Sequence, residues 1–219
     1  TNAQVQFAAL SDATKVDQSF VVAITTAAER SLIGNTAALA ASTVIGAGNK
    51  DLSLKINNKL YNISLAAGTY TREALASHLA ASINAVADPG SKVVTSLNGT
   101  GLELRSALYG TSQSIEVLGG SANADLFLAS GTDSGVDVAG SITIGGVTTA
   151  ATGAGQQLSG ADSTNAKGLR LTITATAPLT DALVTVRKGL AQRTTEKLHS
   201  LTDTLAQILP SLSRSKRRK

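Results

Sequence analysis

The chain has 219 residues, of which 42% are hydrophobic and only 3% are aromatic, and its formal net charge is +4. This length suits one large domain or two small ones, and the absence of cysteine excludes disulfides, thiolate metal sites and cysteine nucleophiles. Every apolar run is interrupted well short of the roughly 20 residues that span a bilayer, so we expect a soluble chain without a membrane segment.

The positive charge is concentrated at the C-terminal end. Five basic residues lie among the last six: Arg214, Lys216, Arg217, Arg218 and Lys219. Without these five, 14 of the 19 basic residues remain against 15 acidic ones, so the body of the chain is close to neutral. A basic tail can bind phosphate or an anionic membrane surface, but no aromatic side chains accompany this one. We therefore interpret it as a solvated terminus and predict neither nucleic acid nor a membrane as a partner.

The first elements in chain order are a strand and a linker. Phe20, Val22 and Ile24 recur at every second position, which is typical of a strand with one buried face. The following run, Asn35–Lys50, is rich in Ala and Gly, and we interpret it as a linker to the next unit. Because the sequence begins with Thr1 and has no basic, apolar leader, we interpret it as a fragment or a processed chain.

A β-hairpin is predicted for the segment from Asp51 to Leu65. Apolar residues alternate on both sides of Asn57-Asn58, a pair suited to a tight turn. The alternating residues are Leu52, Leu54, Ile56, Tyr61, Ile63 and Leu65. We expect Tyr61, like Phe20, to be buried.

An amphipathic helix is predicted in the next stretch, Gly68–Ala85. Thr69 or Thr71 can serve as its N-cap, and Glu73 lies in the first turn, where the helix dipole favours an anion. The apolar residues at helical spacing are Leu75, Leu79, Ile83 and Val86. Asp88-Pro89-Gly90 then ends the helix.

Strands follow on both sides of the Asn98-Gly99 turn signal, and TSQSIEVLG, residues 111–119, predicts another. The resulting order is β, β, α, β, β, β.

From Val136 onward, strand-like runs and glycine-rich turns without a helical segment predict a second β-rich unit. The final stretch has Leu and Ile mostly at three- or four-residue steps, which predicts an amphipathic helix that ends near Pro210. These residues are Leu190, Leu198, Leu201, Leu205, Ile208 and Leu209.

No residue pattern predicts a catalytic, cofactor or metal site. His78 and His199 each lie in a predicted helix, without a partner at i+3 or i+4 that would complete a metal pair. The aspartates of the predicted loops do not match the spacing of a calcium loop, and we interpret them as solvated turn residues. They are Asp133, Asp137 and Asp162. The glycine-rich TGAGQQLSG, residues 152–160, lacks the ending of a Walker loop and is interpreted as a mobile turn between strands.

The predicted helix and its flanking strands resemble the hook IN motif of flagellar axial proteins. In that motif a strand pair leads through Gly-Thr-Tyr to a helix that ends in Ile-Asn, and two further strands close near a glycine. The matching residues here are Gly68, Thr69, Tyr70, Ile83, Asn84, Leu102, Leu104, Ser106 and Gly110. The match keeps the same order from Leu52 to Val117.

Two further segments resemble the family of flagellar filament cap proteins, also called second hook-associated proteins. QSFVVAITTAAERSLIGN, residues 18–35, resembles the strand that enters their outer domains, although the family usually has Leu-Ala-Gln near Thr26–Glu29. GVDVAGSITIGGVTTAATGAGQQLSG, residues 135–160, together with AKGLRLTITA resembles the part that leads back toward their C-terminal stalk.

The resemblance implies an α+β fold that is mainly β. It would comprise two small β-rich head domains, one of them with a β-β-α-β-β hook IN unit, plus a C-terminal helix. One head domain would be discontinuous, with residues 1–48 and 136–188, and residues 49–135 would be inserted into it. Residues 189–219 would form the C-terminal helix and the basic tail.

The resemblance also implies a structural role and no enzymatic activity. Cap proteins form an oligomer at the tip of the bacterial flagellum, outside the cell, and help exported flagellin subunits to insert beneath it. We therefore expect a secreted protein whose partners are flagellin and further copies of itself. The predicted loops 150–160 and 131–135 are the expected contacts, because loops on rigid scaffolds often carry recognition.

Three alternatives remain open. An adhesin-type tip domain that binds a host surface or glycan would need exposed aromatic residues, for which Tyr70 and Tyr109 are the candidates. A hook-filament junction protein or a decorated flagellin also carries hook IN units. The terminal helices of the parent protein would distinguish these classes from a filament cap protein, because their motifs differ. An enzyme ranks last, because no nucleophile elbow is present. Hydrolysis that is abolished by changing one Ser or His would revive that reading.

Overall fold

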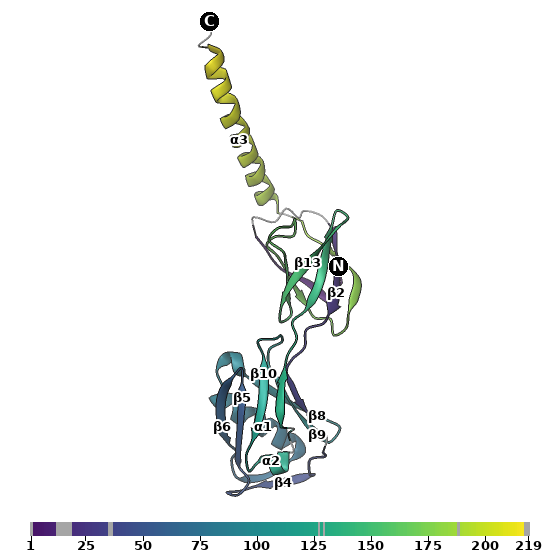
Figure 1. Cartoon of the computed structure of the whole chain (residues 1–219), viewed down its shortest axis with the longest axis vertical. Coiled ribbons are helices and arrows are strands. Elements are labelled where there is room, and N and C mark those ends of the chain that lie inside the picture. Colours follow the sequence, from purple (N-terminus) through teal and green to yellow (C-terminus); the bar gives the residue numbers. More distant parts are fainter. Residues whose placement is uncertain are drawn as a thin grey trace.

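The computed structural model describes residues 2–11, 19–34, 37–126, 128, 130–187 and 189–216. The molecule is elongated, and helix α3 (Leu190–Lys216) projects from one end (Figure 1). Buried apolar residues form two separate cores, one entirely within positions 33–128 and the other entirely outside them. We call residues 31–134 the inserted unit. Residues 2–30 and 135–187 together are called the seven-stranded unit.

The seven-stranded unit is a single antiparallel sheet in the order β1-β15-β14-β13-β12-β2-β16. Its strands are β1 (Val5–Leu10), β2 (Ser19–Thr26), β12 (Ala139–Ile144), β13 (Val147–Ala154), β14 (Gln157–Gly160), β15 (Leu169–Ile173) and β16 (Leu179–Thr185). The two edge strands, β1 and β16, approach each other, so the sheet curls around its own core. The alternation predicted for β2 is confirmed, because Phe20, Val22 and Ile24 are all buried.

The inserted unit contains three small antiparallel sheets, in the orders β11-β10-β5-β6, β3-β9-β8 and β4-β7. Its strands are β3 (Leu32–Gly34), β4 (Ser42–Ile45), β5 (Asp51–Ile56), β6 (Lys59–Ser64), β7 (Gly68–Thr71), β8 (Val93–Asn98), β9 (Gly101–Ser106), β10 (Ser114–Gly119) and β11 (Gly131–Ser134). Its helices are α1 (Arg72–Val86), α2 (Asn123–Leu126) and the 3-10 turn η1 (Pro89–Ser91). Helix α1 packs against β8 and β6, and together with the strands it closes the core.

The predicted hairpin is confirmed as β5 and β6. Leu54 pairs with Tyr61, and the turn residues Asn57 and Asn58 have φ angles of 52° and 65°. Both angles are positive, as a two-residue hairpin turn requires, and Asn tolerates this region better than most residues.

The predicted helix is also confirmed, with one exception at its end. The Thr71 side chain accepts a hydrogen bond from the Ala74 N–H at 3.2 Å, so Thr71 is the N-cap. Leu75, Leu79 and Ile83 are fully buried. The prediction that Val86 belongs to this face is wrong, since its side chain is 55% exposed. Ala87 is buried in its place, four residues after Ile83.

The Ala- and Gly-rich segment Asn35–Lys50 is more than the predicted linker. Its strand β4 pairs with β7, and Leu39 is buried while its N–H donates to the Thr100 carbonyl. Ile33, Leu39 and Ile45 all belong to the core of the inserted unit. The domain division made from the sequence stays a prediction, but packing favours a first boundary near Arg30 over one at residue 48. With only four residues, Ser42–Ile45, this strand is too short to be recognised by hydrophobic periodicity.

Helix α3 does not end near Pro210 as predicted, but continues to Lys216. A proline inside a helix removes one backbone hydrogen bond and its ring crowds the carbonyl four residues earlier, which can kink a helix without ending it. Arg214 and Lys216 therefore lie in α3. The remaining basic residues, Arg217, Arg218 and Lys219, lie outside the described residues.

The two predicted contact loops are largely strands. Residues 150–160 form most of β13 and all of β14, with a turn at Gly155-Gln156, and residues 131–134 form β11. Both segments pair with neighbouring strands, which satisfies the backbone groups that a loop would expose to water.

Candidate functional site

The hook IN residues bind the end of helix α1 to the neighbouring sheet. Ile83 is fully buried, whereas the Asn84 side chain donates to the Val93 carbonyl and accepts from the Val93 N–H, both at 2.8 Å. Val93 is the first residue of β8, so this reciprocal pair fixes where that strand starts. Ser106 is fully buried at the other end of the motif, where its hydroxyl accepts from the Ser31 N–H and donates to the Leu108 carbonyl.

Tyr70 is engaged within the inserted unit and is not a free aromatic platform. Its ring stacks on His78 with centroids 4.8 Å apart, and its hydroxyl donates to the Ala66 carbonyl at 3.0 Å. The Nε2 atom of His78 accepts from the Ala66 N–H at 3.0 Å. His199 lies far from this group, on α3. Across the residues that the structure describes, no three His, Cys, Asp or Glu side chains gather to hold a metal ion.

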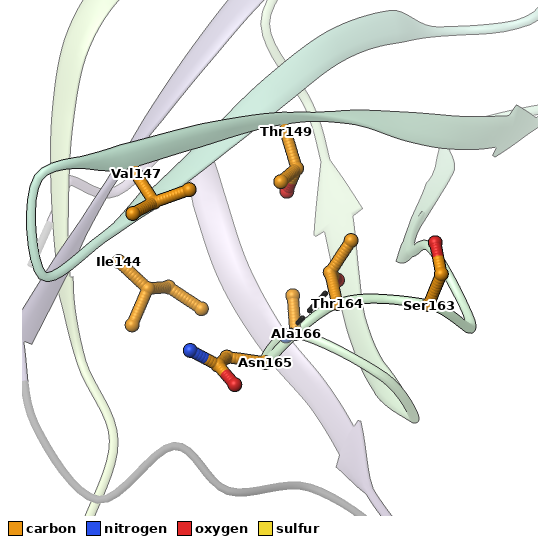
Figure 2. Close-up of a pocket in the computed structure, with 7 residues that line it drawn as sticks. All are labelled: Ile144, Val147, Thr149, Ser163, Thr164, Asn165 and Ala166. Atoms are coloured by element: carbon orange, nitrogen blue, oxygen red, sulfur yellow. Dashed lines mark hydrogen bonds between the residues drawn. The ribbon is translucent and has the colours of Figure 1, made fainter.

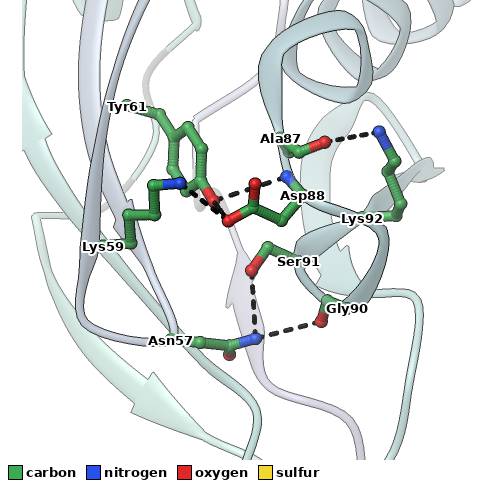
Figure 3. A network of polar contacts seen from close by, with 8 residues as sticks. All are labelled: Asn57, Lys59, Tyr61, Ala87, Asp88, Gly90, Ser91 and Lys92. Carbon is green, nitrogen blue, oxygen red and sulfur yellow. Dashed lines mark hydrogen bonds and ion pairs between the residues drawn. The ribbon is translucent and has the colours of Figure 1, made fainter.

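A polar network joins the β5–β6 hairpin to the C-terminal end of α1. Figure 3 shows Lys59 and the Tyr61 hydroxyl directed at the Asp88 carboxylate, at 2.8 Å and 3.0 Å. Hydrogen bonds from Lys59 and then Tyr61 lower the pKa of Asp88, and the same contact raises the pKa of Lys59. Lys92 donates to the Ala87 carbonyl at 2.6 Å, which places a cation at the negative end of the helix dipole.

The described part of the surface has a small pocket and a larger cleft. One small pocket of about 200 Å³ lies between the β12–β13 turn and the loop before β15 (Figure 2). Val147 and Ile144 form one side, and Asn165 and Ala166 face them from the loop. It is smaller than the roughly 300–1,000 Å³ typical of ligand pockets.

A larger cleft of about 640 Å³ lies where the two units meet. Its lining includes Tyr109 and Gln113 from the inserted unit and Gln156 and Thr172 from the seven-stranded unit. Tyr109 packs against the core of the seven-stranded unit, and the Arg30 guanidinium lies 4.6 Å from the centre of its ring. Tyr109 therefore contributes to the contact between the two units, which we call the junction. Like Tyr70, it is engaged within the molecule and is not a free aromatic platform for a host surface or glycan.

Asp137 is the polar centre of this junction. Its carboxylate accepts from the Gly155 N–H at 2.6 Å, from the Thr111 N–H at 3.2 Å and from the Thr111 hydroxyl. The hydrogen bond from the Thr111 hydroxyl is the main cause that lowers the pKa of Asp137, and the Gly155 N–H adds to it. The interpretation of Asp137 as a solvated turn residue is therefore wrong.

The other two loop aspartates differ. Asp133 lies in β11, and its carboxylate accepts from the Leu32 N–H at 2.6 Å, so it too was wrongly interpreted as a solvated turn residue. Asp162 is exposed in a turn, as predicted.

Sequence reasoning missed the partners of Asp137, namely Thr111 and Gly155. Gly110, which closes the hook IN motif, was the one available signal. Its φ is +103°, and a Cβ there would lie 2.3 Å from a carboxylate oxygen of Asp137 and 2.8 Å from the Gly155 Cα. Glycine is required at this position because two backbones and a carboxylate meet there.

No helix among the described residues is long and apolar enough to cross a membrane.

No protein-family model and no curated protein matches the sequence. Solved structures do match. The chain is similar to the D2-D3 domains of the flagellar cap protein FliD from Serratia marcescens, with a TM-score of 0.52 and 16% identity over 83% of this chain and 98% of that one.

Two structures of FliD from Escherichia coli are also similar. The D2-D3 domains match with a TM-score of 0.50 and 14% identity over 85% of this chain and 96% of that one. The D1-D2-D3 domains match with a TM-score of 0.51 and 15% identity, over 94% of this chain but only 63% of that one. At this identity the likeness establishes the fold: a mainly β pair of head domains with a C-terminal helix, as the resemblance implied. The fold is that of the D2-D3 domains of flagellar cap protein FliD.

Proposed function

We propose that this chain is the head region of a bacterial flagellar filament cap protein, acts outside the cell at the filament tip, and has no enzymatic activity. There it promotes the insertion and polymerisation of exported flagellin. The observation that carries this proposal is the likeness to FliD D2-D3 domains over both units at once. Hook IN residues that hold α1 to β8 support it independently of the overall fold.

A cap of this kind works through surfaces. One head unit is a single curled sheet and the other is three small sheets joined in part by polar side chains, and such a scaffold can stand as a rigid body at the rim of a growing filament. Rigidity matters because a cap must limit the escape of subunits without closing the path along which they fold and insert.

Helix α3 is the element through which copies associate in this proposal. Leu198, Leu201, Leu205 and Ile208 follow steps of three, four and three residues, which is a coiled-coil spacing. All four side chains are between 45% and 59% exposed. A helix that projects from the body with such a stripe gains stability when the stripe is covered by other helices.

The test is deletion of the parent gene in its source bacterium, followed by measurement of unpolymerised flagellin in the culture supernatant and imaging of the filaments. We expect leaked flagellin with short or absent filaments, and full recovery when the intact gene is returned. Normal filaments without leaked flagellin would refute the cap function. If surface attachment alone were lost, the chain would be assigned to adhesion instead.

The role of α3 has its own matched pair of variants. Leu201→Glu with Leu205→Glu should restore neither filaments nor flagellin retention, because two charges would enter the covered stripe. His199→Glu with Ser200→Glu adds the same charge to neighbouring positions of the helix outside the stripe and should restore both. Equal rescue by the two pairs would exclude α3 from the interface.

A further inference from the structure

The chain crosses between the two units twice, and the crossings are paired. Glu29 on the outward path and Val136 on the return path exchange two backbone hydrogen bonds, at 2.9 Å and 3.0 Å. A connection of only two paired backbone segments can still twist and bend. Two crossings alone would leave the angle between the units free to vary.

A third connection comes from residues 108–113 of the inserted unit, which we call the junction arm. The Gly110 N–H donates to the Glu29 carbonyl at 3.0 Å, and the Gly135 N–H donates to the Gln113 carbonyl at 2.8 Å. Tyr109 of the arm packs against the core of the other unit, under the Arg30 guanidinium. The arm therefore contacts both crossings and the far core.

Asp137 links the arm to a different strand pair of the seven-stranded unit. One carboxylate binds Thr111 of the arm through its N–H and hydroxyl, and binds the Gly155 N–H in the turn between β13 and β14. The Val138 N–H, one residue later, donates to the Gly155 carbonyl at 2.9 Å. The turn is thus held through both the N–H and the carbonyl of Gly155, and it lies against the arm.

We propose that Asp137, Thr111 and Gly155 form a clasp that fixes the angle between the two units. Two paired crossings resist stretching, whereas a third contact placed off their axis resists rotation and bending. The clasp supplies that contact with a charge that three donors hold in place, and such hydrogen bonds are stronger than those between neutral groups. Asp137 is a positioning residue, and its role does not depend on whether the chain belongs to a filament cap.

The clasp is tested by measuring the distance between one label in each unit of the intact chain. The sequence has no cysteine, so Ala81→Cys on α1 and Asp181→Cys on β16 accept a pair of nitroxide labels without competition. Both positions are exposed. Pulsed double electron–electron resonance then gives the distribution of distances between the two units.

We expect a single narrow distribution in the parent chain and a distribution at least about twice as wide in Asp137→Ala. Thr111→Val removes only the hydroxyl contact and should give an intermediate width, which also decides the question if Asp137→Ala folds poorly. Asp162→Ala and Thr100→Val change an exposed aspartate and an exposed threonine outside the junction, and should leave the width unchanged. Circular dichroism of each variant checks that both units remain folded.

Unchanged widths in folded Asp137→Ala and Thr111→Val would overturn the proposal, since the crossings would then suffice to fix the angle. A broad distribution already present in the parent chain would overturn it as well. The flagellin assay above is independent of either result.

Discussion

Both units of this molecule enclose an apolar core, but their strands are arranged differently around it. The seven-stranded unit is one continuous sheet, in which each strand pairs with its neighbour apart from local register shifts. The inserted unit is divided into three small sheets and a helix. Among the described residues, all five buried polar side chains lie in the inserted unit: Ser31, Thr43, Ser91, Ser106 and Gln113.

The difference shows what replaces a continuous ladder when a sheet is broken. Each sheet end leaves backbone donors and acceptors without strand partners, and leaving them buried and unpaired costs more than one hydrogen bond contributes. In the inserted unit, side chains fill these positions: Asn84 pairs with Val93, Ser106 with Ser31, and Asp133 with Leu32. Polar side chains are therefore structural where the backbone ladder is interrupted.

The largest expected effect tests whether the two cores are energetically separate. Leu79→Ala in the inserted unit and Leu171→Ala in the seven-stranded unit each truncate a fully buried leucine and should each cost about 3 kcal/mol. Hydrogen exchange followed peptide by peptide should show lost protection only in the unit that carries the substitution. If either variant lowered protection equally in both units, the two cores would unfold as one cooperative body, and the comparison would fail.

The sequence predicted those elements whose signals are local. The β5–β6 hairpin has its turn pair and its alternation within 15 residues of chain, and α1 has its cap, its stripe and its stop signal in a single run. Strand β4 was missed because its partner β7 lies about 25 residues away and the strand itself has only four residues. Pairing across such a separation leaves no periodic pattern in either strand alone.

The junction could not be predicted from the sequence either, because the residues that meet there are far apart along the chain. Thr111, Asp137 and Gly155 come from three distant segments, and each alone is a common turn residue. Only the resemblance to the hook IN motif drew attention to Gly110, and it did so without indicating what the glycine must accommodate. The need for glycine there arises from the other unit.

An intermediate effect tests the role of polar side chains at a broken ladder. Asn84→Ala removes both bonds to Val93 and leaves two backbone groups without partners, so it should destabilise the inserted unit by about 2 kcal/mol. Asn84→Asp keeps the acceptor for the Val93 N–H but places a carboxylate oxygen against the Val93 carbonyl, and should not restore stability. Asn62→Ala changes an exposed asparagine on β6 and is the matched control. Chemical denaturation measures all three, and equal stability of Asn84→Ala and Asn62→Ala would show that the pair with Val93 contributes little.

The smallest expected effect is a loss of stability in acid that is larger for the inserted unit, because it holds two carboxyls of lowered pKa against one, Asp137, in the seven-stranded unit. Asp88 and Glu103 in the inserted unit have pKa values below the ordinary 3.8 and 4.5, because of hydrogen bonds from Lys59 and from Arg105. A carboxyl whose pKa is lower in the folded state stabilises that state fully above its ordinary pKa, and this contribution is lost as the pH falls through the folded value. The inserted unit should therefore lose stability progressively below about pH 4.5.

Glu103→Gln should flatten this loss, because the substituted side chain no longer takes up a proton on unfolding. Asp162→Asn, at an exposed turn of the seven-stranded unit, should leave the acid profile unchanged. Thermal unfolding followed by calorimetry between pH 6 and pH 2.5 measures both. The effect is small because these groups lie near the surface, where solvent screens their charges. If the seven-stranded unit lost stability at a higher pH than the inserted unit, the lowered pKa values of Asp88 and Glu103 would not determine which unit is more sensitive to acid.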